Sequence, residues 1–259
     1  MPSARVLKGA LGIAIVFVVW WISVPLVGLP DFFYPSPQAV WAAFVEMMEK
    51  GVLPSHIVDS LFRYTAGLFI ATSLGLIVGL TIALSRSVAR ALEPLVNFLY
   101  ALIEIAWLPI LILWFGFGLT TILVTVVYVV IWPIIFNAIV GVRSLPIVYV
   151  NAALSLGGSR WQVIRDVILP GVLPHVLTGF RIAAGFAFRA LILGEILAGT
   201  SGLGYLIFET ANNLQTDRTL VGMICMGLMW LFVDNVYLKP FEEITVRRWG
   251  VLLSAEDND

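Results

Sequence analysis

Six runs of about 20 mainly apolar residues constrain this chain more than any other feature of its sequence. A helix of about 20 residues crosses the hydrocarbon core of a bilayer, so each run can form a membrane-spanning helix. The runs lack the alternating polar and apolar residues of transmembrane β-strands. We therefore expect an all-α integral membrane protein of the cell (inner) membrane with about six transmembrane helices. The runs cover residues 9–27, 64–84, 95–114, 121–142, 172–197 and 219–237.

The composition supports a membrane protein and excludes several other classes. Hydrophobic residues supply 60% of the chain and charged residues 12%, against roughly 45–50% and about 25% in soluble domains. With a formal net charge of −1 and no basic stripe, the chain lacks the electrostatic footprint of a nucleic-acid-binding protein. The single cysteine, Cys225, excludes an internal disulfide. His56 and His175 are too far apart in the sequence for the spacing of metal ligands.

The placement of lysine and arginine predicts the orientation of the chain, because cytoplasmic loops carry an excess of these residues. The expected outer segments carry only Lys50 and Arg218. Both termini are therefore expected in the cytoplasm. The expected cytoplasmic segments carry Arg5, Lys8, Arg86, Arg90, Arg143, Arg160, Arg165, Lys239, Arg247 and Arg248.

These expectations divide the chain into regions along its length. In the outer segment, Ser36 followed by Pro37 indicates the start of a helix, and apolar residues after them suit a helix lying along the membrane interface. The regions are a cytoplasmic N-terminus (residues 1–8), a first transmembrane helix (9–27), the outer segment (28–63), a helical core with the second to sixth spans (64–250) and a cytoplasmic loop (151–170), and a cytoplasmic tail (251–259).

Small residues recur every four positions in the second apolar run. Such a stripe lets another helix approach closely, so it predicts a helix–helix seam. The stripe consists of Gly67, Ala71, Gly75, Gly79 and Ala83.

The cytoplasmic loop 151–170 has the signals of two short helices joined by a tight turn. Gly157 and Gly158 end the first helix, since glycine adopts a left-handed turn at low cost. Ser159 and Gln162 form a capping-box pattern at the start of the second helix, and Leu169-Pro170 is expected to end it and to start the next span. The product is a compact knuckle that suits contact with a partner; the alternative is an ordinary connecting loop.

The same stretch resembles the cytoplasmic loop of permease subunits of binding-protein-dependent ABC importers. Asn151 replaces the family's glutamate and Val167 stands at its isoleucine position. The matching residues are Ala152, Ala153, Gly157, Leu169 and Pro170. Further motifs resemble the nitrate, taurine, aliphatic-sulfonate and pyrimidine-precursor branch: His56…Ser60-Leu61…Arg63, Ala106-Trp107-Leu108-Pro109…Trp114-Phe115-Gly116, Leu177-Thr178-Gly179…Arg181 and Ser201-Gly202-Leu203-Gly204-Tyr205.

This resemblance implies the type I ABC importer permease fold and a loop that couples the chain to a separate ATPase. The implied coupling residues are Asn151, Ala152, Ala153, Ser155, Leu156, Gly157, Ser159, Arg160 and Trp161. The sequence contains no GxxxxGK[ST] phosphate-binding loop, so ATP and Mg²⁺ are expected in the partner ATPase and no cofactor in this chain. The resemblance also implies a second permease copy, two ATP-binding subunits and an extracytoplasmic solute-binding protein.

Ionisable residues inside apolar runs are costly and usually face a cavity or a partner. We expect Glu104 and Arg181 to pair with each other. Arg189 has no acidic residue three or four positions away, so it either attracts an anionic solute or contacts a neighbouring helix. Glu195 is expected near the outer surface as a solvated charge or gate residue. With Trp107, these residues form the candidate substrate pathway.

Arg63 is expected to form a local helical pair with Asp59, four residues before it.

Two functions follow from these patterns. The first is the permease subunit of an ATP-driven importer for a small anionic solute, a transport subunit rather than an enzyme. The second is a secondary transporter driven by an ion gradient. It would be favoured by an internal repeat, which the sequence does not show, or by transport that continues without an ATPase.

Overall fold

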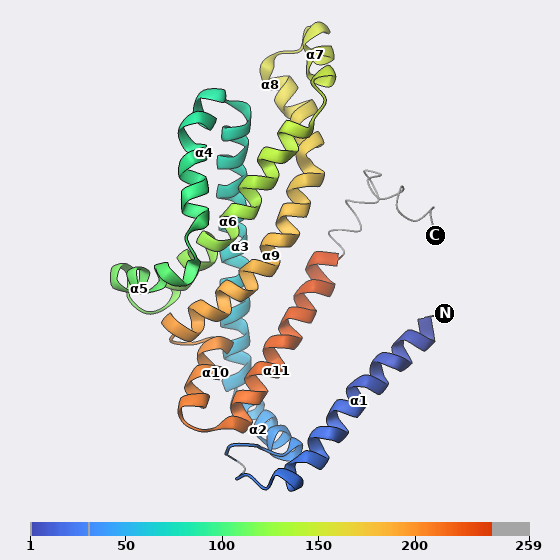
Figure 1. Ribbon diagram of the computed structural model, residues 1–259, viewed down its shortest axis with the longest axis vertical. Coiled ribbons are helices and arrows are strands. Elements are labelled where there is room, and N and C mark those ends of the chain that lie inside the picture. The colour runs from blue at the N-terminus through green and yellow to red at the C-terminus, as the bar shows by residue number, and fades with distance from the viewer. Residues whose placement is uncertain (1, 31, 240–259) are drawn as a thin grey trace. The chain divides into compact units, whose positions relative to one another are not determined.

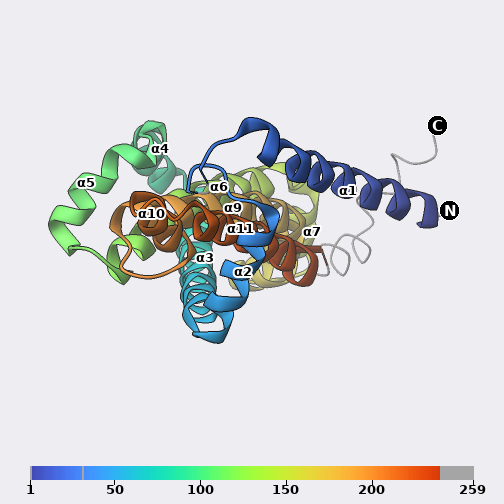
Figure 2. The same cartoon turned by 90° about the horizontal axis from the view of Figure 1, so that it is seen from below.

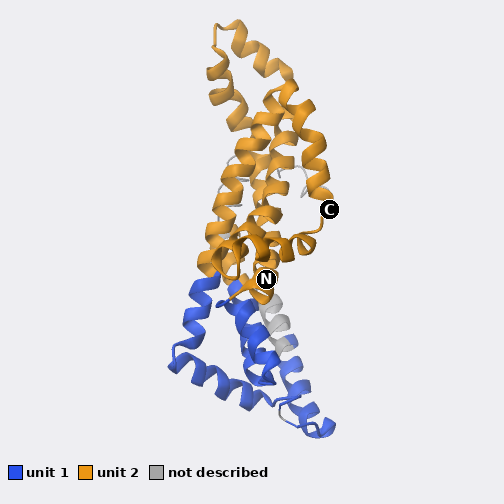
Figure 3. Ribbon diagram, turned by 90° about the vertical axis from the view of Figure 1, so that its left-hand side faces the viewer, with its two compact units in different colours: residues 1–60, 200–229 blue, residues 61–199, 230–259 orange. Residues whose placement is uncertain are grey.

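The structure is a computed structural model that describes residues 2–30 and 32–239. The predicted tail 251–259 and the expected cytoplasmic residues Arg247 and Arg248 lie outside these residues. The all-α prediction is confirmed, because the described residues form helices and no strand. The chain divides into two compact units, residues 1–60 with 200–229 and residues 61–199 with 230–259 (Figure 3).

The first unit contains helices from both ends of the sequence. Ser36 caps α2 by accepting a hydrogen bond from the Ala39 N–H at 3.2 Å, which confirms the predicted helix start. The Ser23 and Tyr34 hydroxyls bond at 2.7 Å and tie the end of α1 to the segment before α2. The elements of this unit are α1 (Pro2–Val27), α2 (Pro37–Glu49), the first part of α3 (Val52–Leu84), α10 (Leu203–Asn212) and most of α11 (Thr216–Val233).

The second unit is built around α6, which packs along α9 and α3 (Figure 1). Figure 2 shows α4 and α5 to one side of α6 and α9. The elements of this unit are the rest of α3, α4 (Arg86–Ala101), α5 (Glu104–Phe115), α6 (Leu119–Ser144), α7 (Ile147–Ser155), α8 (Arg160–Val163), the π-helix η1 (Ile164–Ile168), α9 (Leu169–Ala198) and the π-helix η2 (Asp234–Leu238).

The predicted small-residue seam forms the contact between α3 and α6. A Cβ atom added to Gly79 would lie 2.8 Å from the Ala138 Cβ and 3.0 Å from the Ile135 carbonyl oxygen. A Cβ at Gly75 would lie 3.0 Å from the Ile131 carbonyl oxygen. The two backbones are therefore closer than any larger side chain at these positions would allow.

The candidate membrane spans correct two of the predicted boundaries. Within the described residues, four helices are long and apolar enough to cross a membrane: Val52–Leu84, Leu119–Ser144, Arg160–Ala198 and Thr216–Val236. The predicted span 95–114 is not one helix, because α4 and α5 meet at a bend of 95°. Leu169 does begin α9, as predicted, but Leu169-Pro170 does not interrupt the helix: the π-helix η1 joins α8 to α9 without a break, and its wider turn precedes Pro170.

Candidate functional site

The knuckle between α6 and α9 has the geometry that its sequence predicts. Helix α7 ends at Ser155, and Gly157 adopts φ +86° in the turn that follows. The Gly158 N–H donates to the Ala153 carbonyl at 3.0 Å and closes this turn. Ser159 then caps α8: its hydroxyl accepts from the Gln162 N–H at 3.3 Å, and its own N–H donates to the Gln162 side chain at 2.7 Å. The capping box is confirmed.

One side of the knuckle is anchored and the other is open. Val163, Ile168 and Val172 form a buried apolar cluster at its base, against which Ala153 and Val150 pack. Helix α7 itself has no buried residue. At the tip, large apolar side chains are exposed, with Leu156 89% and Trp161 68% accessible. An anchored turn that presents apolar side chains outside the bundle is a surface for a partner.

A buried ion pair joins α3 to α9. The Arg63 guanidinium donates to the Glu195 carboxylate at 3.0 Å, and the two side chains are 7% and 0% exposed. Arg63 thus pairs with a residue 132 positions away, and the expected local pair with Asp59 is not formed. Glu195 is not a solvated surface charge, because its side chain is fully buried against α3.

The two arginines of α9 are exposed. Arg181 and Arg189 both lie on the accessible surface of the second unit. Within the described residues, Arg189 has no ion pair or hydrogen bond. Its helical face also carries exposed Ile182 and Phe186. An arginine on an apolar helix face at membrane depth needs water, a lipid headgroup or a partner.

Glu104 and Trp107 occupy the first turns of α5, just after the bend. No ion pair joins Glu104 to Arg181 in the described part of the chain, so the predicted pair is wrong. The prediction assumed one continuous span, whereas the 95° bend turns α5 away from the direction of α4. The Trp107 indole N–H donates to the Tyr128 hydroxyl of α6 at 2.9 Å, a contact for which the sequence gives no local signal.

Two of the sequence motifs meet at the start of α10. The Gly202 N–H donates to His56 Nδ1 at 2.9 Å, and the Leu203 N–H donates to the Ser60 hydroxyl at 2.8 Å. These side chains satisfy N–H groups that the first turn of a helix leaves without an intrahelical acceptor. His56 and Ser60 therefore have a structural role that explains their spacing of four residues on α3.

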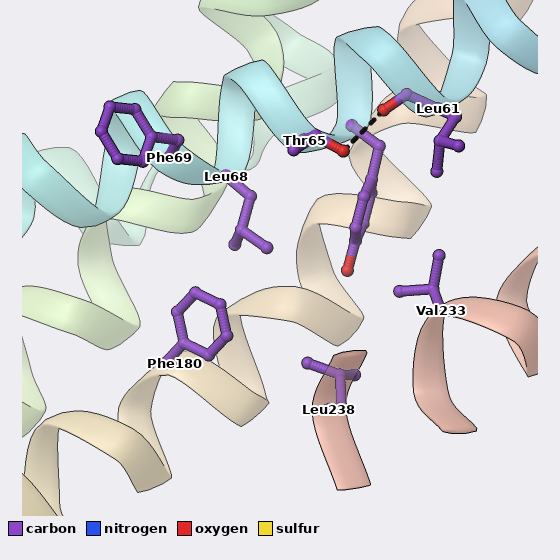
Figure 4. A pocket seen from close by; sticks show the side chains of 8 residues that line it. Leu61, Thr65, Leu68, Phe69, Phe180, Val233 and Leu238 are labelled. Carbon is purple, nitrogen blue, oxygen red and sulfur yellow. Dashed lines mark hydrogen bonds between the residues drawn. The ribbon is translucent and has the colours of Figure 1, made fainter. Parts of the chain in front are cut away.

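An apolar cavity of about 190 Å³ lies between α3, α9 and the end of α11 (Figure 4). Its polar atoms are already bonded: Thr65 donates to the Leu61 carbonyl at 2.8 Å and Tyr64 to the Ala184 carbonyl at 3.2 Å. Among the residues that the structure describes, those lining the cavity carry no charge. The lining residues are Leu61, Tyr64, Thr65, Leu68, Phe69, Phe180, Val233 and Leu238.

Several apolar spans, an arginine exposed at membrane depth and a projecting knuckle together define a membrane transport component. The chain matches the family model for the "Binding-protein-dependent transport system inner membrane component" over residues 71–238. The taurine transport system permease protein TauC of Escherichia coli (strain K12) is 33% identical over 239 residues, covering 90% of this chain and 87% of TauC. The nitrate import permease protein NrtB of Synechocystis is 28% identical over 254 residues, covering 94% and 90%.

The fold is similar to that of a solved importer. A chain of the MetNI methionine ABC transporter, in an inward-facing conformation, has a TM-score of 0.60 at 18% identity, covering 76% of this chain and 98% of that chain. This chain belongs to the family of inner membrane components of binding-protein-dependent transport systems. It is a permease subunit of an ABC importer, which confirms the resemblance seen in its motifs, and as such it is a transport subunit and not an enzyme.

Proposed function

We propose that this permease carries a small anionic solute and is driven by a separate ATPase that binds the knuckle. The observation that carries the proposal is the contrast between the anchored base of the knuckle and its exposed apolar tip at Leu156 and Trp161. A partner that pulls on the tip would move α9, because one continuous helix runs from Arg160 to Ala198. The energy of ATP hydrolysis in the partner, which uses Mg²⁺ as its cofactor, would thereby reach the membrane helices.

The coupling contact comprises the turn and the helix ends on either side of it. Gly157 is needed for its positive φ, and Ser159 for the cap. Asn151 and Ala152 lie on the exposed side of α7, and Ala153 holds α7 against the apolar base of the knuckle. Ser155, Leu156, Arg160 and Trp161 complete the proposed docking surface.

The solute pathway is proposed on the face of α9 that carries Arg189. An exposed guanidinium without an ion pair or hydrogen bond in the described residues attracts anions, and its planar fork matches carboxylate, sulfonate and nitrate oxygens. The names of the relatives TauC and NrtB, which refer to taurine and nitrate, agree with such solutes. Arg181, Glu104 and Trp107 are proposed to contribute to the same path, and Glu195, through its buried pair with Arg63, is proposed to hold α9 against α3 beside it.

A single chain of this kind supplies half of a pathway, so we propose a homodimer. Two ATP-binding subunits would dock at the two knuckles, and an extracytoplasmic binding protein would deliver the solute at the opposite side. The distribution of lysine and arginine in the sequence supports cytoplasmic termini and a cytoplasmic knuckle.

The proposal is tested by co-purification of the permease with the ATP-binding subunit of its own transporter. Leu156→Ala and Trp161→Ala are expected to reduce the bound ATPase about tenfold, a loss of about 1.4 kcal/mol. Leu26→Ala is the matched control, because Leu26 is also a largely exposed leucine, at 79%, on α1. Knuckle variants that retain the ATPase and transport at wild-type levels would disprove the coupling role.

A further inference from the structure

The bend between α4 and α5 lies at two residues that do not break helices. Leu102 and Ile103 adopt extended conformations, with φ, ψ of −81°, 121° and −67°, 134°. Neither is glycine or proline, and both are compatible with a helix. The flanking prolines, Pro94 and Pro109, lie inside α4 and α5 and not at the bend. Pro94 and Pro109 would each kink a continuous helix over residues 86–115, but neither interrupts the chain at Leu102 and Ile103, so a contact from elsewhere favours the bend at these two residues.

That contact is the hydroxyl of Tyr128, on α6. It donates to the Leu99 carbonyl at 2.6 Å, with the Leu102 carbonyl also within reach at 3.1 Å. It accepts from the Trp107 indole N–H at 2.9 Å. One hydroxyl thus joins the last turn of α4, the first turns of α5 and the middle of α6.

The ring of Tyr128 is held by aromatic packing. It meets Trp132 edge to face with ring centres 5.5 Å apart, and Trp107 at 5.9 Å. Contacts of this geometry are favourable for aromatic side chains. Side chains of α5 and α6 therefore hold the Tyr128 hydroxyl next to the bend.

The Tyr128 contacts and the straight helix compete for the same carbonyl groups. In a continuous α-helix, the Leu99 carbonyl would accept from the Ile103 N–H and the Leu102 carbonyl from the Ala106 N–H. In the structure, the Ala106 N–H bonds instead to the Ile103 carbonyl at 3.0 Å. At the bend the Leu99 carbonyl keeps a backbone bond from the Leu102 N–H at 3.2 Å, and the Tyr128 hydroxyl adds a second donor to it and lies within reach of the Leu102 carbonyl. These contacts are available only in the bent form, so Tyr128 stabilises it against a continuous helix.

We infer that Tyr128 is a positioning residue, whose hydroxyl holds α5 at its angle to α4. Glu104 and Trp107 lie on α5, so the same hydroxyl also orients this part of the proposed solute pathway. This last step rests on the proposed function. The bend itself can be measured without transport, so the two proposals can fail separately.

The experiment measures the distance between spin labels on α4 and α5. Cysteines replace Ala91 and Leu113, both exposed, in the full chain in lipid nanodiscs, after Cys225→Ala removes the single native cysteine. With a rise of 1.5 Å per residue, a straight helix would separate the two Cα atoms by about 33 Å, whereas the 95° bend gives about 21 Å. Pulsed electron paramagnetic resonance resolves this difference.

Tyr128→Phe removes the hydroxyl and keeps the ring. We expect the wild-type chain to show the shorter distance and Tyr128→Phe to gain a population near the longer one. Tyr64→Phe is the matched control, because it also removes a phenol hydroxyl bonded to a carbonyl, that of Ala184, away from the bend. The control is expected to retain the shorter distance. A Tyr128→Phe chain with only the shorter distance would overturn the inference.

Trp107→Phe provides a second test that does not depend on how well Tyr128→Phe folds. It removes one donor to the hydroxyl and leaves the bonds to the Leu99 and Leu102 carbonyls. We expect a smaller long-distance population than in Tyr128→Phe. If Tyr128→Phe does not fold, a Trp107→Phe chain that keeps the wild-type distance alone would contradict the role of this hydroxyl.

Transport then separates the two proposals. In liposomes containing the assembled transporter, uptake of labelled taurine and nitrate is measured for Tyr128→Phe and Tyr64→Phe. Where the wild type carries either solute, a several-fold slower uptake by Tyr128→Phe alone supports the link between the bend and the pathway. If the distance changes and uptake does not, the link between the bend and transport is refuted. The inference that Tyr128 stabilises the bend would still stand.

Discussion

Two faces of the helix α9 carry charge in different ways. On one face, Glu195 is fully buried and pairs with Arg63 of α3 at 3.0 Å. On another, Arg189 is exposed beside Ile182 and Phe186, without an ion pair or hydrogen bond in the described residues. The first charge is satisfied inside the chain, and the second requires a partner outside it.

This difference separates residues that hold the fold from residues available for function. A buried ion pair is costly to break because the remaining charge is left without compensation. An exposed charge can be neutralised without a large change in folding. Changes on the buried side should therefore alter stability first, and changes on the exposed side should alter transport first.

The largest effect is expected at the buried pair. Glu195→Gln would leave the Arg63 charge without its anionic partner, at a cost of about 3–5 kcal/mol. The measurement is thermal unfolding of the purified permease in detergent. Arg63→Met combined with Glu195→Leu removes both charges and should recover much of this loss. If the separate effects of changing Arg63 and Glu195 simply add, the two residues do not act as a pair.

The seam between α3 and α6 should be the next most sensitive place. Gly79→Ala adds a Cβ 2.8 Å from the Ala138 Cβ and 3.0 Å from the Ile135 carbonyl oxygen, and overpacking of this kind costs about 1–3 kcal/mol. Gly227→Ala is the matched control on α11, because its Cβ would have no neighbour within 4 Å. The same melting experiment should show a loss for Gly79→Ala and no loss for Gly227→Ala; equal effects would argue against a tight seam.

On the exposed face, the expected change is in transport and not in folding. Arg189→Gln should leave the melting temperature unchanged and reduce uptake of the sulfonate or oxyanion that the wild type carries, tested with taurine (a zwitterion with a sulfonate group) and nitrate, about tenfold, equivalent to about 1.4 kcal/mol. Arg189→Lys keeps the charge but loses the planar fork, so it should retain part of the uptake. Wild-type uptake by Arg189→Gln in proteoliposomes would remove Arg189 from the pathway.

The sequence predicted those parts of the fold that depend on local pattern. The caps at Ser36 and Ser159 were predicted because a side chain and the N–H that it caps lie within three residues. The small-residue stripe of α3 was predicted because its period is that of a helix face. In each case the information is contained in one short segment.

The remaining features depend on contacts between distant residues. Helical periodicity suggested Asp59 as a partner for Arg63, whereas the actual partner, Glu195, lies 132 residues away. The apolar run 95–114 resembles a single span because Leu102 and Ile103 carry no breaking signal, and the contact at the bend comes from Tyr128. Tertiary contacts override local propensity at both places.

A second ion-pair site, at Glu46 on α2, is exposed and is expected to have the smallest effect. The pKa of Glu46 is lowered from its ordinary value of 4.5, first by the hydrogen bond from Lys50 and then by the charge of Arg218. The folded carboxylate therefore contributes stability above that ordinary value and loses it as pH falls through the lowered pKa.

Melting temperatures recorded from about pH 6 to about pH 3 test this contribution. Glu46→Gln cannot titrate, so the wild type should lose slightly more stability on acidification than this variant. The difference should be small because solvent screens an exposed pair, in contrast to the buried Arg63–Glu195 pair. A loss at Glu46 as large as that in Glu195→Gln would contradict the view that burial, and not pairing as such, determines how much an ion pair matters here.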